Sequence, residues 1–196
     1  DGYRLFSYDF EGYLKDVGTI ESLWEANMDI LGDTPVLNMR DEENCVYARN
    51  YAHPSSFISA DAEIVNSYIA EGSTVYGKVY NSVIGCGVTI GEGTVVRDSI
   101  IMNETVIGDN CEINKGIIAE NVVIGDDVKL GVGEEIDNDT APHIYNHGLV
   151  TIGEKTVVPN GVSVGKNSVV SGNTTVADYP DMYLGSGKTL IKAGDE

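Results

Sequence analysis

Few residues of this chain have the type and spacing that enzyme chemistry requires. Asp16 opens the segment DVGT, where a carboxylate can ligate Mg²⁺ or simply form a turn before a helix. The three histidines are His53, His143 and His147. Three histidines can hold a zinc ion, and one can act as a general base. Because His143 and His147 occupy a loop and His53 precedes a proline, we expect neither a zinc site nor a catalytic histidine.

The cysteines and the overall charge exclude several classes of protein. Cys45, Cys86 and Cys111 are odd in number and far apart, so they predict no disulfide framework and fit the reducing cytoplasm. The net charge is −19, which repels nucleic acid and anionic lipid. No apolar run is long enough to span a membrane, and the opening residues do not form a signal peptide. We expect no nucleic-acid partner and no membrane partner, and the lack of an initiator Met suggests a piece of a longer chain.

The elements that must position these side chains follow a repeat of 17 residues. The pairs that begin at Ile90, Ile107 and Ile124 each consist of isoleucine and glycine, and apolar residues within a unit are separated by steps of 6, 6 and 5. Such a period matches neither an amphipathic helix nor an alternating strand. It fits a triangular coil with one short strand on each side and one β-branched side chain pointing inward. The sequence therefore predicts a mostly β protein, a parallel β-helix of hexapeptide repeats, rather than an antiparallel sandwich.

The same spacing predicts which side chains fill the interior. A less regular first coil is marked by Ile58, Ile64, Ile69 and Val75, and the last regular steps end at Val176. No coil can bury enough apolar surface by itself, so the coils must fold by stacking. We expect the structural core to contain Ile84, Ile90, Ile101, Ile107, Ile118, Ile124, Ile152, Val158, Val164 and Val170.

The two ends of the chain and one internal segment depart from the repeat. Apolar residues at helical spacing predict a helix from Thr19, a plausible N-cap, to Leu31, and residues 6–10 resemble a strand. Residues 136–145 indicate a loop or insertion. The final 20 residues, with Gly185, Gly187 and Gly194, are expected to cap the open end of the β-helix, because exposed strand edges need cover.

The segment GYLKDVGTIESLWEANMDIL, residues 12–31, closely resembles the end of the catalytic domain of bacterial glucose-1-phosphate adenylyltransferases, also called ADP-glucose pyrophosphorylases. The repeats, including GLVTIGEKTVVPNG, are similar to the C-terminal left-handed β-helix of that family. The resemblance implies that residues 1–31 end an α/β nucleotidyltransferase domain as a strand and helix. It also implies that residues 32–54 are a connector and that residues 55–196 are the hexapeptide β-helix with its cap.

The resemblance also implies a function. The family makes ADP-glucose and pyrophosphate from ATP and glucose 1-phosphate for glycogen biosynthesis, and Asp16 matches a carboxylate that ligates Mg²⁺ there. This chain would be the C-terminal assembly and regulatory domain of a cytoplasmic, tetrameric, allosteric enzyme, with its own N-terminal catalytic domain as a partner. No glycine-rich nucleotide loop is present, so the piece itself is expected to be inactive and to hold no cofactor. Lys155 lies, one position out of register, in a stretch similar to an activator-contacting segment of plant relatives.

Alternatives remain open at this level. Leu14 occupies a position where the family usually carries Trp, which leaves room for a non-catalytic paralogous subunit. The other hypotheses are a hexapeptide-repeat acyltransferase and a purely structural assembly module. Tyr68, Tyr76 and Tyr80 are expected to point outward and to promote self-association, although they can instead pack against the connector or against a preceding domain.

Overall fold

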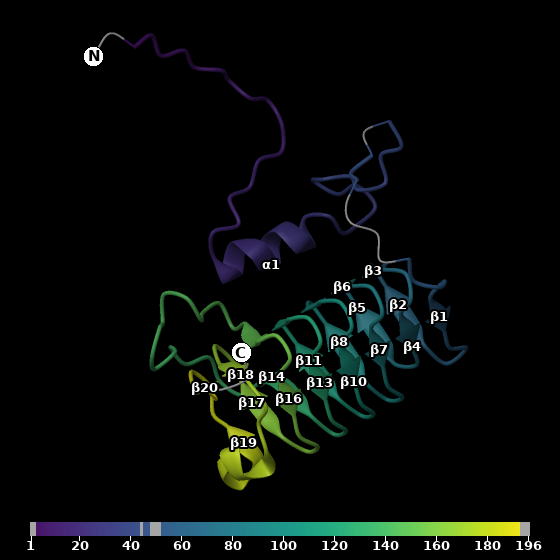
Figure 1. The fold of residues 1–196 in the computed structure, drawn as a ribbon, viewed down its shortest axis with the longest axis vertical. Coiled ribbons are helices and arrows are strands. Elements are labelled where there is room, and N and C mark those ends of the chain that lie inside the picture. Colours follow the sequence, from purple (N-terminus) through teal and green to yellow (C-terminus); the bar gives the residue numbers. More distant parts are fainter. Residues whose placement is uncertain (1–2, 44, 48–51, 193–196) are drawn as a thin grey trace.

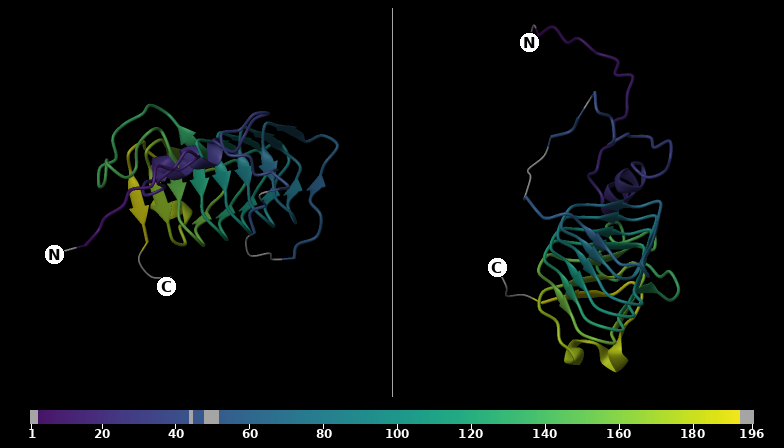
Figure 2. Two further views of the ribbon diagram at one scale, coloured as in Figure 1. Left: turned by 90° about the horizontal axis from the view of Figure 1, so that it is seen from above. Right: turned by 90° about the vertical axis from the view of Figure 1, so that its right-hand side faces the viewer.

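The computed structural model describes residues 3–43, 45–47 and 52–192, and its main body is a parallel β-helix (Figure 1). Successive strands along the chain belong to three different sheets, and the pairings between the strands are parallel. The chain therefore winds around a common axis, with one sheet on each side of the coil, as the end-on view of Figure 2 shows. The prediction of a β-helix of short strands is confirmed.

The strands are very short, from two to four residues. The first sheet contains, in spatial order, β1 (Phe57–Ile58), β4 (Thr74–Val75), β7 (Thr89–Ile90), β10 (Val106–Ile107), β13 (Val123–Ile124) and β16 (Val157–Val158). The second contains β2 (Glu63–Val65), β5 (Lys78–Tyr80), β8 (Val95–Arg97), β11 (Glu112–Asn114), β14 (Lys129–Val132), β17 (Ser163–Gly165) and β19 (Tyr183–Leu184). The third contains β3 (Tyr68–Ile69), β6 (Val83–Ile84), β9 (Ile100–Ile101), β12 (Gly116–Ile118), β15 (Val150–Ile152), β18 (Val169–Ser171) and β20 (Thr189–Ile191).

One aliphatic side chain per strand points into the coil. Ile107 pairs with Ile90 on one side and with Ile124 on the other, so identical side chains stack along the axis. The ten core residues expected from the spacing are each at most 1% exposed and belong to one hydrophobic cluster. Burial of such a side chain stabilises the fold by about 1.5–3 kcal/mol. The stacked aliphatic column is therefore the main source of stability.

Polar residues occupy the corners between the sheets. Asp109 and Asp126 use side-chain oxygens to accept backbone N–H groups from the neighbouring coil, those of Glu92 at 2.8 Å and Asp109 at 2.9 Å. Asn110 and Asp127 adopt left-handed backbone conformations, which Asn and Asp tolerate better than most residues. The corners thus satisfy backbone groups that the short strands leave free.

An insertion interrupts the coils between β14 and β15. Residues 133–149 leave the β-helix and project from it (Figure 1), while Ile118 still pairs with Ile152 across the interruption. Two buried asparagines hold its base: Asn138 Nδ2 donates to the Asn167 carbonyl at 2.9 Å, and Asn167 Nδ2 donates to the Ile136 carbonyl at 3.0 Å. The irregular segment expected at 136–145 is therefore a longer, anchored loop.

The single α-helix of the described residues, α1 (Ile20–Met28), lies along the outside of the β-helix, as both views of Figure 2 show. Thr19 is its N-cap, as predicted. It ends three residues before the expected Leu31, and Gly32 then takes a left-handed φ of 95° that glycine adopts without strain. No described helix has the length and apolar character needed to cross a membrane.

Two expectations about the ends were wrong. Residues 6–10 form no strand among the described residues, because no neighbouring strand pairs with their backbone. Val176 is 51% exposed rather than part of the core, because the chain leaves the coil there and begins a 3₁₀ helix (Val176–Asp178). Tyr179 enters the core in its place, with its hydroxyl 2.7 Å from Thr174 Oγ1.

The last coil closes with irregular structure. A second 3₁₀ helix (Pro180–Met182) precedes β19, which pairs with β17, and β20 then pairs with β18. The final segment thus extends two of the three sheets, while Asn173 continues the first sheet only through an isolated bridge to Val157. Gly194, one of the glycines expected in the cap, lies outside the described residues.

Candidate functional site: the DVGT segment and its platform

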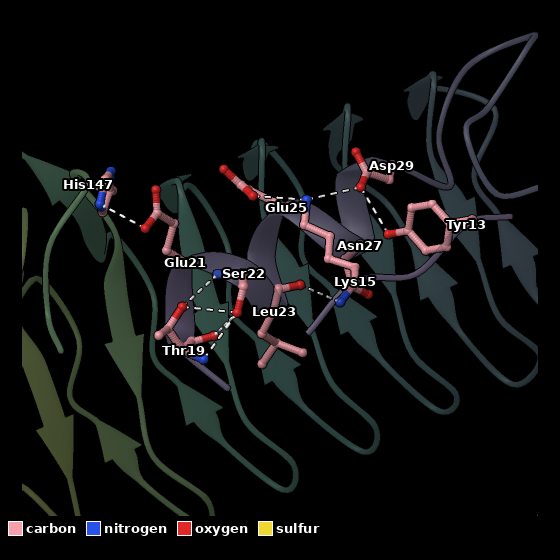
Figure 3. A network of polar contacts seen from close by, with 10 residues as sticks. All are labelled: Tyr13, Lys15, Thr19, Glu21, Ser22, Leu23, Glu25, Asn27, Asp29 and His147. Carbon is pink, nitrogen blue, oxygen red and sulfur yellow. Dashed lines mark hydrogen bonds and ion pairs between the residues drawn. The ribbon is translucent and has the colours of Figure 1, made fainter. Parts of the chain in front are cut away.

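The DVGT segment is held against α1 by a compact polar network. Lys15 Nζ lies 2.9 Å from Glu25 Oε2 and 3.0 Å from Asp29 Oδ2, and the Tyr13 hydroxyl donates to the same Asp29 oxygen at 2.9 Å (Figure 3). Glu25 and Asp29 are four residues apart on one face of the end of α1, so a single lysine can reach both. The network fixes the segment that precedes the helix.

The network shifts the ionisation of its members. The hydrogen bond from Lys15 lowers the pKa of Asp29, and the hydrogen bond to Glu25 raises the pKa of Lys15. Partial desolvation raises the pKa of Tyr13, and its hydrogen bond to Asp29 adds to that shift. At neutral pH the cluster therefore holds one ammonium group between two carboxylates, with a neutral phenol at its edge.

Alternation along the extended segment directs Leu14 and Asp16 away from the helix. Tyr13 and Lys15 are half-buried against α1, whereas Leu14 is 84% exposed and Asp16 is exposed. Extended backbone places successive side chains on opposite sides, so the contacts of Tyr13 and Lys15 turn their neighbours outward. Asp16 Oδ1 accepts only the Gly18 N–H, at 3.1 Å, among the described residues.

A capping box joins the DVGT segment to the helix. Thr19 Oγ1 accepts the Ser22 N–H at 3.1 Å, and Ser22 Oγ accepts the Thr19 N–H at the same distance. Both bonds satisfy backbone donors that the first turn of a helix otherwise leaves unpaired. The position of Asp16 is therefore tied to the N-terminal end of α1.

The helix is in turn fixed to the outer face of the third sheet. Trp24 Nε1 donates to the Asp98 carbonyl at 2.7 Å, and Trp24 packs with Ile20 and Met28 against outward-pointing side chains of the β-helix. Those side chains are Ile100 of β9, Ile117 of β12 and Leu149 at the end of the insertion. The β-helix thus forms a rigid platform under the DVGT segment.

Asp16 has the chemistry of one Mg²⁺ ligand but not of a complete site. Mg²⁺ prefers hard oxygen donors and is commonly held by one or two carboxylates together with substrate phosphates. The described residues contain no group of three His, Cys, Asp or Glu that could hold a metal ion. An exposed carboxylate on a fixed segment fits a metal whose other ligands come from outside this chain.

The three histidines are not brought together. His53 Nε2 lies 3.2 Å from Glu104 Oε1 beside a cavity of about 210 Å³, His143 is exposed in the insertion, and His147 Nε2 lies 2.9 Å from Glu21 Oε2. Their separate partners leave no shared metal geometry.

The candidate effector residue Lys155 stands apart from the DVGT platform. Its side chain is exposed and pairs with Glu154 at 3.1 Å, and its N–H donates to the Glu120 carbonyl at a corner of the β-helix. No second basic residue contacts it among the described residues. The structure gathers no cluster of cations for a phosphate or carboxylate at this point.

The three tyrosines have different surroundings. Tyr68 is half-buried and lines a cavity of about 250 Å³ together with Leu31 and with Arg40 of the connector. The centre of the Tyr80 ring lies 4.1 Å from the guanidinium carbon of Arg97, and the Tyr76 and Phe57 rings make a tilted contact with their centres 5.9 Å apart. Of the three, Tyr76 alone remains largely available on the surface.

Sequence reasoning named Asp16 but missed the residues that hold it. One sequence pattern could have indicated them: two carboxylates, Glu25 and Asp29, stand four residues apart on a predicted helix, where one cation such as Lys15 can reach both. His147 and Glu21 had no such pattern, because they are far apart in the chain and meet only in the folded protein. The same is true of Trp24 and Asp98.

Comparison with known proteins gives the family. A family model described as GlmU-like, C-terminal hexapeptide, matches residues 53–152. The chain is 53% identical over 192 residues to the glucose-1-phosphate adenylyltransferase of Lachnospira eligens, covering 98% of this chain and 45% of the relative. It is 40% identical to that of Acetivibrio thermocellus, covering 100% and 46%, and 48% identical to that of Thermosipho melanesiensis, covering 85% and 40%.

The chain spans less than half the length of these curated relatives and aligns with them as one block of up to 195 residues. The matched family segment begins just before β1 and ends with β15, so it covers most of the coils of the β-helix together with the insertion. From the coils and from this match, the chain belongs to the GlmU-like C-terminal hexapeptide family.

Proposed function

We propose that this chain is the C-terminal assembly and regulatory part of a glucose-1-phosphate adenylyltransferase. The intact protein would form ADP-glucose and pyrophosphate from ATP and glucose 1-phosphate, as the first step toward glycogen. It would act in the cytoplasm as a homo-oligomer, in our proposal a tetramer. Residues 3–31 would complete the catalytic domain, and the β-helix would hold that end in place.

The observation that carries this proposal is the fixed, outward-facing Asp16. The network of Tyr13, Lys15, Glu25 and Asp29 does not include Asp16, whose carboxylate is exposed and accepts only the Gly18 N–H among the described residues. The ion pairs of Lys15 and the capping box of Thr19 fix the backbone on either side of this exposed carboxylate. A preceding catalytic domain would meet this face.

Asp16 would hold Mg²⁺ together with donors from the rest of the intact protein and from the nucleotide. The metal, when bound, would neutralise charge that develops on the phosphates during in-line displacement. The contribution of this chain is to fix the carboxylate of Asp16, so that the ligand does not need to be ordered when substrate binds. Lys15 forms its ion pairs with Glu25 and Asp29, so it does not neutralise the carboxylate of Asp16.

The test uses the full-length protein and this chain side by side in an assay for ADP-glucose with ATP, glucose 1-phosphate and Mg²⁺. The full-length protein is expected to turn over, and this chain alone should remain at background because it lacks a nucleotide loop. Asp16→Asn in the full-length protein should lower kcat by roughly 10²–10³-fold, as the loss of one charge-stabilising group does. Turnover by the short chain, or full activity of the Asp16→Asn variant, would contradict the proposal.

Leu14 favours a second candidate function, that of a non-catalytic paralogous subunit of the same complex. Its side chain is exposed on the same side as Asp16, where it offers a smaller apolar surface than the Trp usual in the family. In this case the full-length protein would be inactive by itself but would raise the activity of a catalytic partner when the two are co-expressed. The same assay, run with and without that partner, distinguishes the two candidates.

A further inference from the structure

The insertion between β14 and β15 contacts the N-terminal end of α1 at two places. His147 Nε2 lies 2.9 Å from Glu21 Oε2, in the first turn of the helix (Figure 3). Leu149 is buried together with Ile20 and Trp24. The insertion therefore meets the helix within a few residues of Thr19 and of the DVGT segment.

The insertion is itself rigidly anchored. Asn167 Oδ1 accepts the Gly148 N–H at 2.7 Å in a buried position, while its Nδ2 donates to the Ile136 carbonyl at the other end of the loop. His147 and Gly148 both have left-handed φ angles, 58° and 74°, which form a tight turn back toward β15. The imidazole of His147 is thus presented by a fixed turn rather than by a free loop.

A lysine of the β-helix completes the contact. Lys115 Nζ donates to the His147 carbonyl at 3.3 Å and lies 5.5 Å above the centre of the Trp24 ring. Glu135 approaches Gly148 from the same loop. Glu21 contacts the His147 imidazole, while Lys115 contacts the His147 carbonyl and Glu135 lies beside Gly148.

We propose that residues 133–149 act as a clamp on α1, with His147 as a positioning residue for Asp16. This inference rests on the proposed function of Asp16 as a metal ligand. The clamp holds the first turn of α1 through Glu21, the first turn holds Thr19 through the capping box, and Thr19 follows the DVGT segment directly. Loss of the His147 contact would let this end of the helix move and would loosen the Asp16 carboxylate.

The test compares three substitutions in the full-length protein. His147→Asn removes the reach of the side chain while keeping a residue that tolerates a left-handed φ. His147→Lys supplies a longer side chain that can donate to Glu21, and this chain already places Lys115 and Lys155 in that backbone conformation. His143→Asn, in the exposed part of the same loop, is the matched control.

His147→Asn should weaken the apparent affinity for Mg²⁺ by about two- to fivefold, because an exposed ion pair such as His147–Glu21 contributes no more than that. The KM for glucose 1-phosphate should change little, and His147→Lys should retain most of the wild-type Mg²⁺ dependence. A general loss of stability would not weaken Mg²⁺ binding while leaving both the KM for glucose 1-phosphate and the His147→Lys variant nearly unchanged. If His147→Asn has the same Mg²⁺ dependence as His143→Asn, the inference is wrong.

Amide hydrogen exchange separates this inference from the proposed function. Exchange in the first turn of α1, residues 20–24, should rise in His147→Asn and remain at the wild-type level in His147→Lys and His143→Asn. If neither the wild type nor any variant makes ADP-glucose, the proposed function is wrong. The amide exchange rates of residues 20–24 still show whether residues 133–149 hold α1. Unchanged exchange in His147→Asn would overturn the clamp whatever the activity.

Discussion

Single carboxylates in this acidic chain differ sharply in their surroundings. Asp16 accepts one backbone N–H, Asp29 accepts bonds from a lysine and a tyrosine, and Asp178 is paired most strongly. Asp178 lies 2.6 Å from Lys192 Nζ and accepts both the N–H and the hydroxyl of Thr175. Those bonds lower the pKa of Asp178 to about 2, the Lys192 bond contributing most.

The depressed pKa of Asp178 predicts an acid transition in the C-terminal cap. Because the folded-state pKa lies below the ordinary 3.8, the stabilising contribution is complete above that pH and is lost as pH falls toward about 2. The Thr175 amide resonance and the exchange of nearby amides should therefore change between about pH 4 and pH 2 in the wild type. Asp178→Asn should abolish this change.

Asp181→Asn is the matched control for that measurement. Asp181 is an exposed aspartate of the same cap with a left-handed φ that Asn tolerates. The acid transition should persist in this variant. A transition that survives in Asp178→Asn as well would show that another group controls the cap.

At the scale of elements, strands of two to four residues cannot be stable individually. Their ladders contain few hydrogen bonds, so each strand depends on the coils before and after it. In β10 two adjacent residues face opposite sides of the sheet. Ile107 points into the core and stacks between Ile90 and Ile124, whereas Val106 is 43% exposed on the outer face.

This difference predicts unequal costs for truncation of the two neighbours. Ile107→Ala should lower the free energy of unfolding by about 2–5 kcal/mol, because it leaves a cavity in the stacked column. Val106→Ala should cost about 0.5 kcal/mol or less, as expected of a surface position. Denaturant unfolding followed by circular dichroism measures both. Equal effects of the two substitutions would contradict the inward placement of Ile107.

At the scale of the molecule, the end of the β-helix that begins with β1 exposes a group of apolar side chains. Phe57 and Ile58 of β1, Val65 of β2 and Tyr76 after β4 are all exposed, and β1 to β3 form the outer edges of the three sheets. An open edge with apolar side chains favours association with another chain. We expect this end to contribute to self-association.

Tyr76→Lys should therefore weaken assembly. Light scattering at micromolar concentration should show a dimer or larger species for the wild type and a shift toward monomer for the variant, because the substitution buries a charge at the contact. Tyr80 is a poorer choice than the sequence indicated, since its ring is already covered by Arg97. Tyr183→Lys, a tyrosine of similar exposure near the opposite end, is the control and should leave assembly unchanged. A monomeric wild-type chain would refute this prediction.

The amino-acid sequence by itself determined the coil, its core and the start of the helix. The spacing of Ile90, Ile107 and Ile124 repeats a local geometric requirement in every coil, and Thr19 caps a helix whose signal lies within a few neighbouring residues. The resemblance of the DVGT segment also singled out Asp16 as a candidate metal ligand, and that role stays a prediction. Periodicity and capping act over short separations, so they can be read without knowledge of the fold.

Tertiary structure decided the rest. It showed that residues 6–10 have no strand partner, that Tyr179 replaces Val176 in the core, and that Lys15 bridges Glu25 and Asp29. It also placed the insertion against the first turn of α1 through His147 and Glu21. These contacts join residues far apart in the chain, and their geometry depends on how the helix docks onto the stacked coils. No local pattern encodes that docking, because it follows from the shape of the completed outer face.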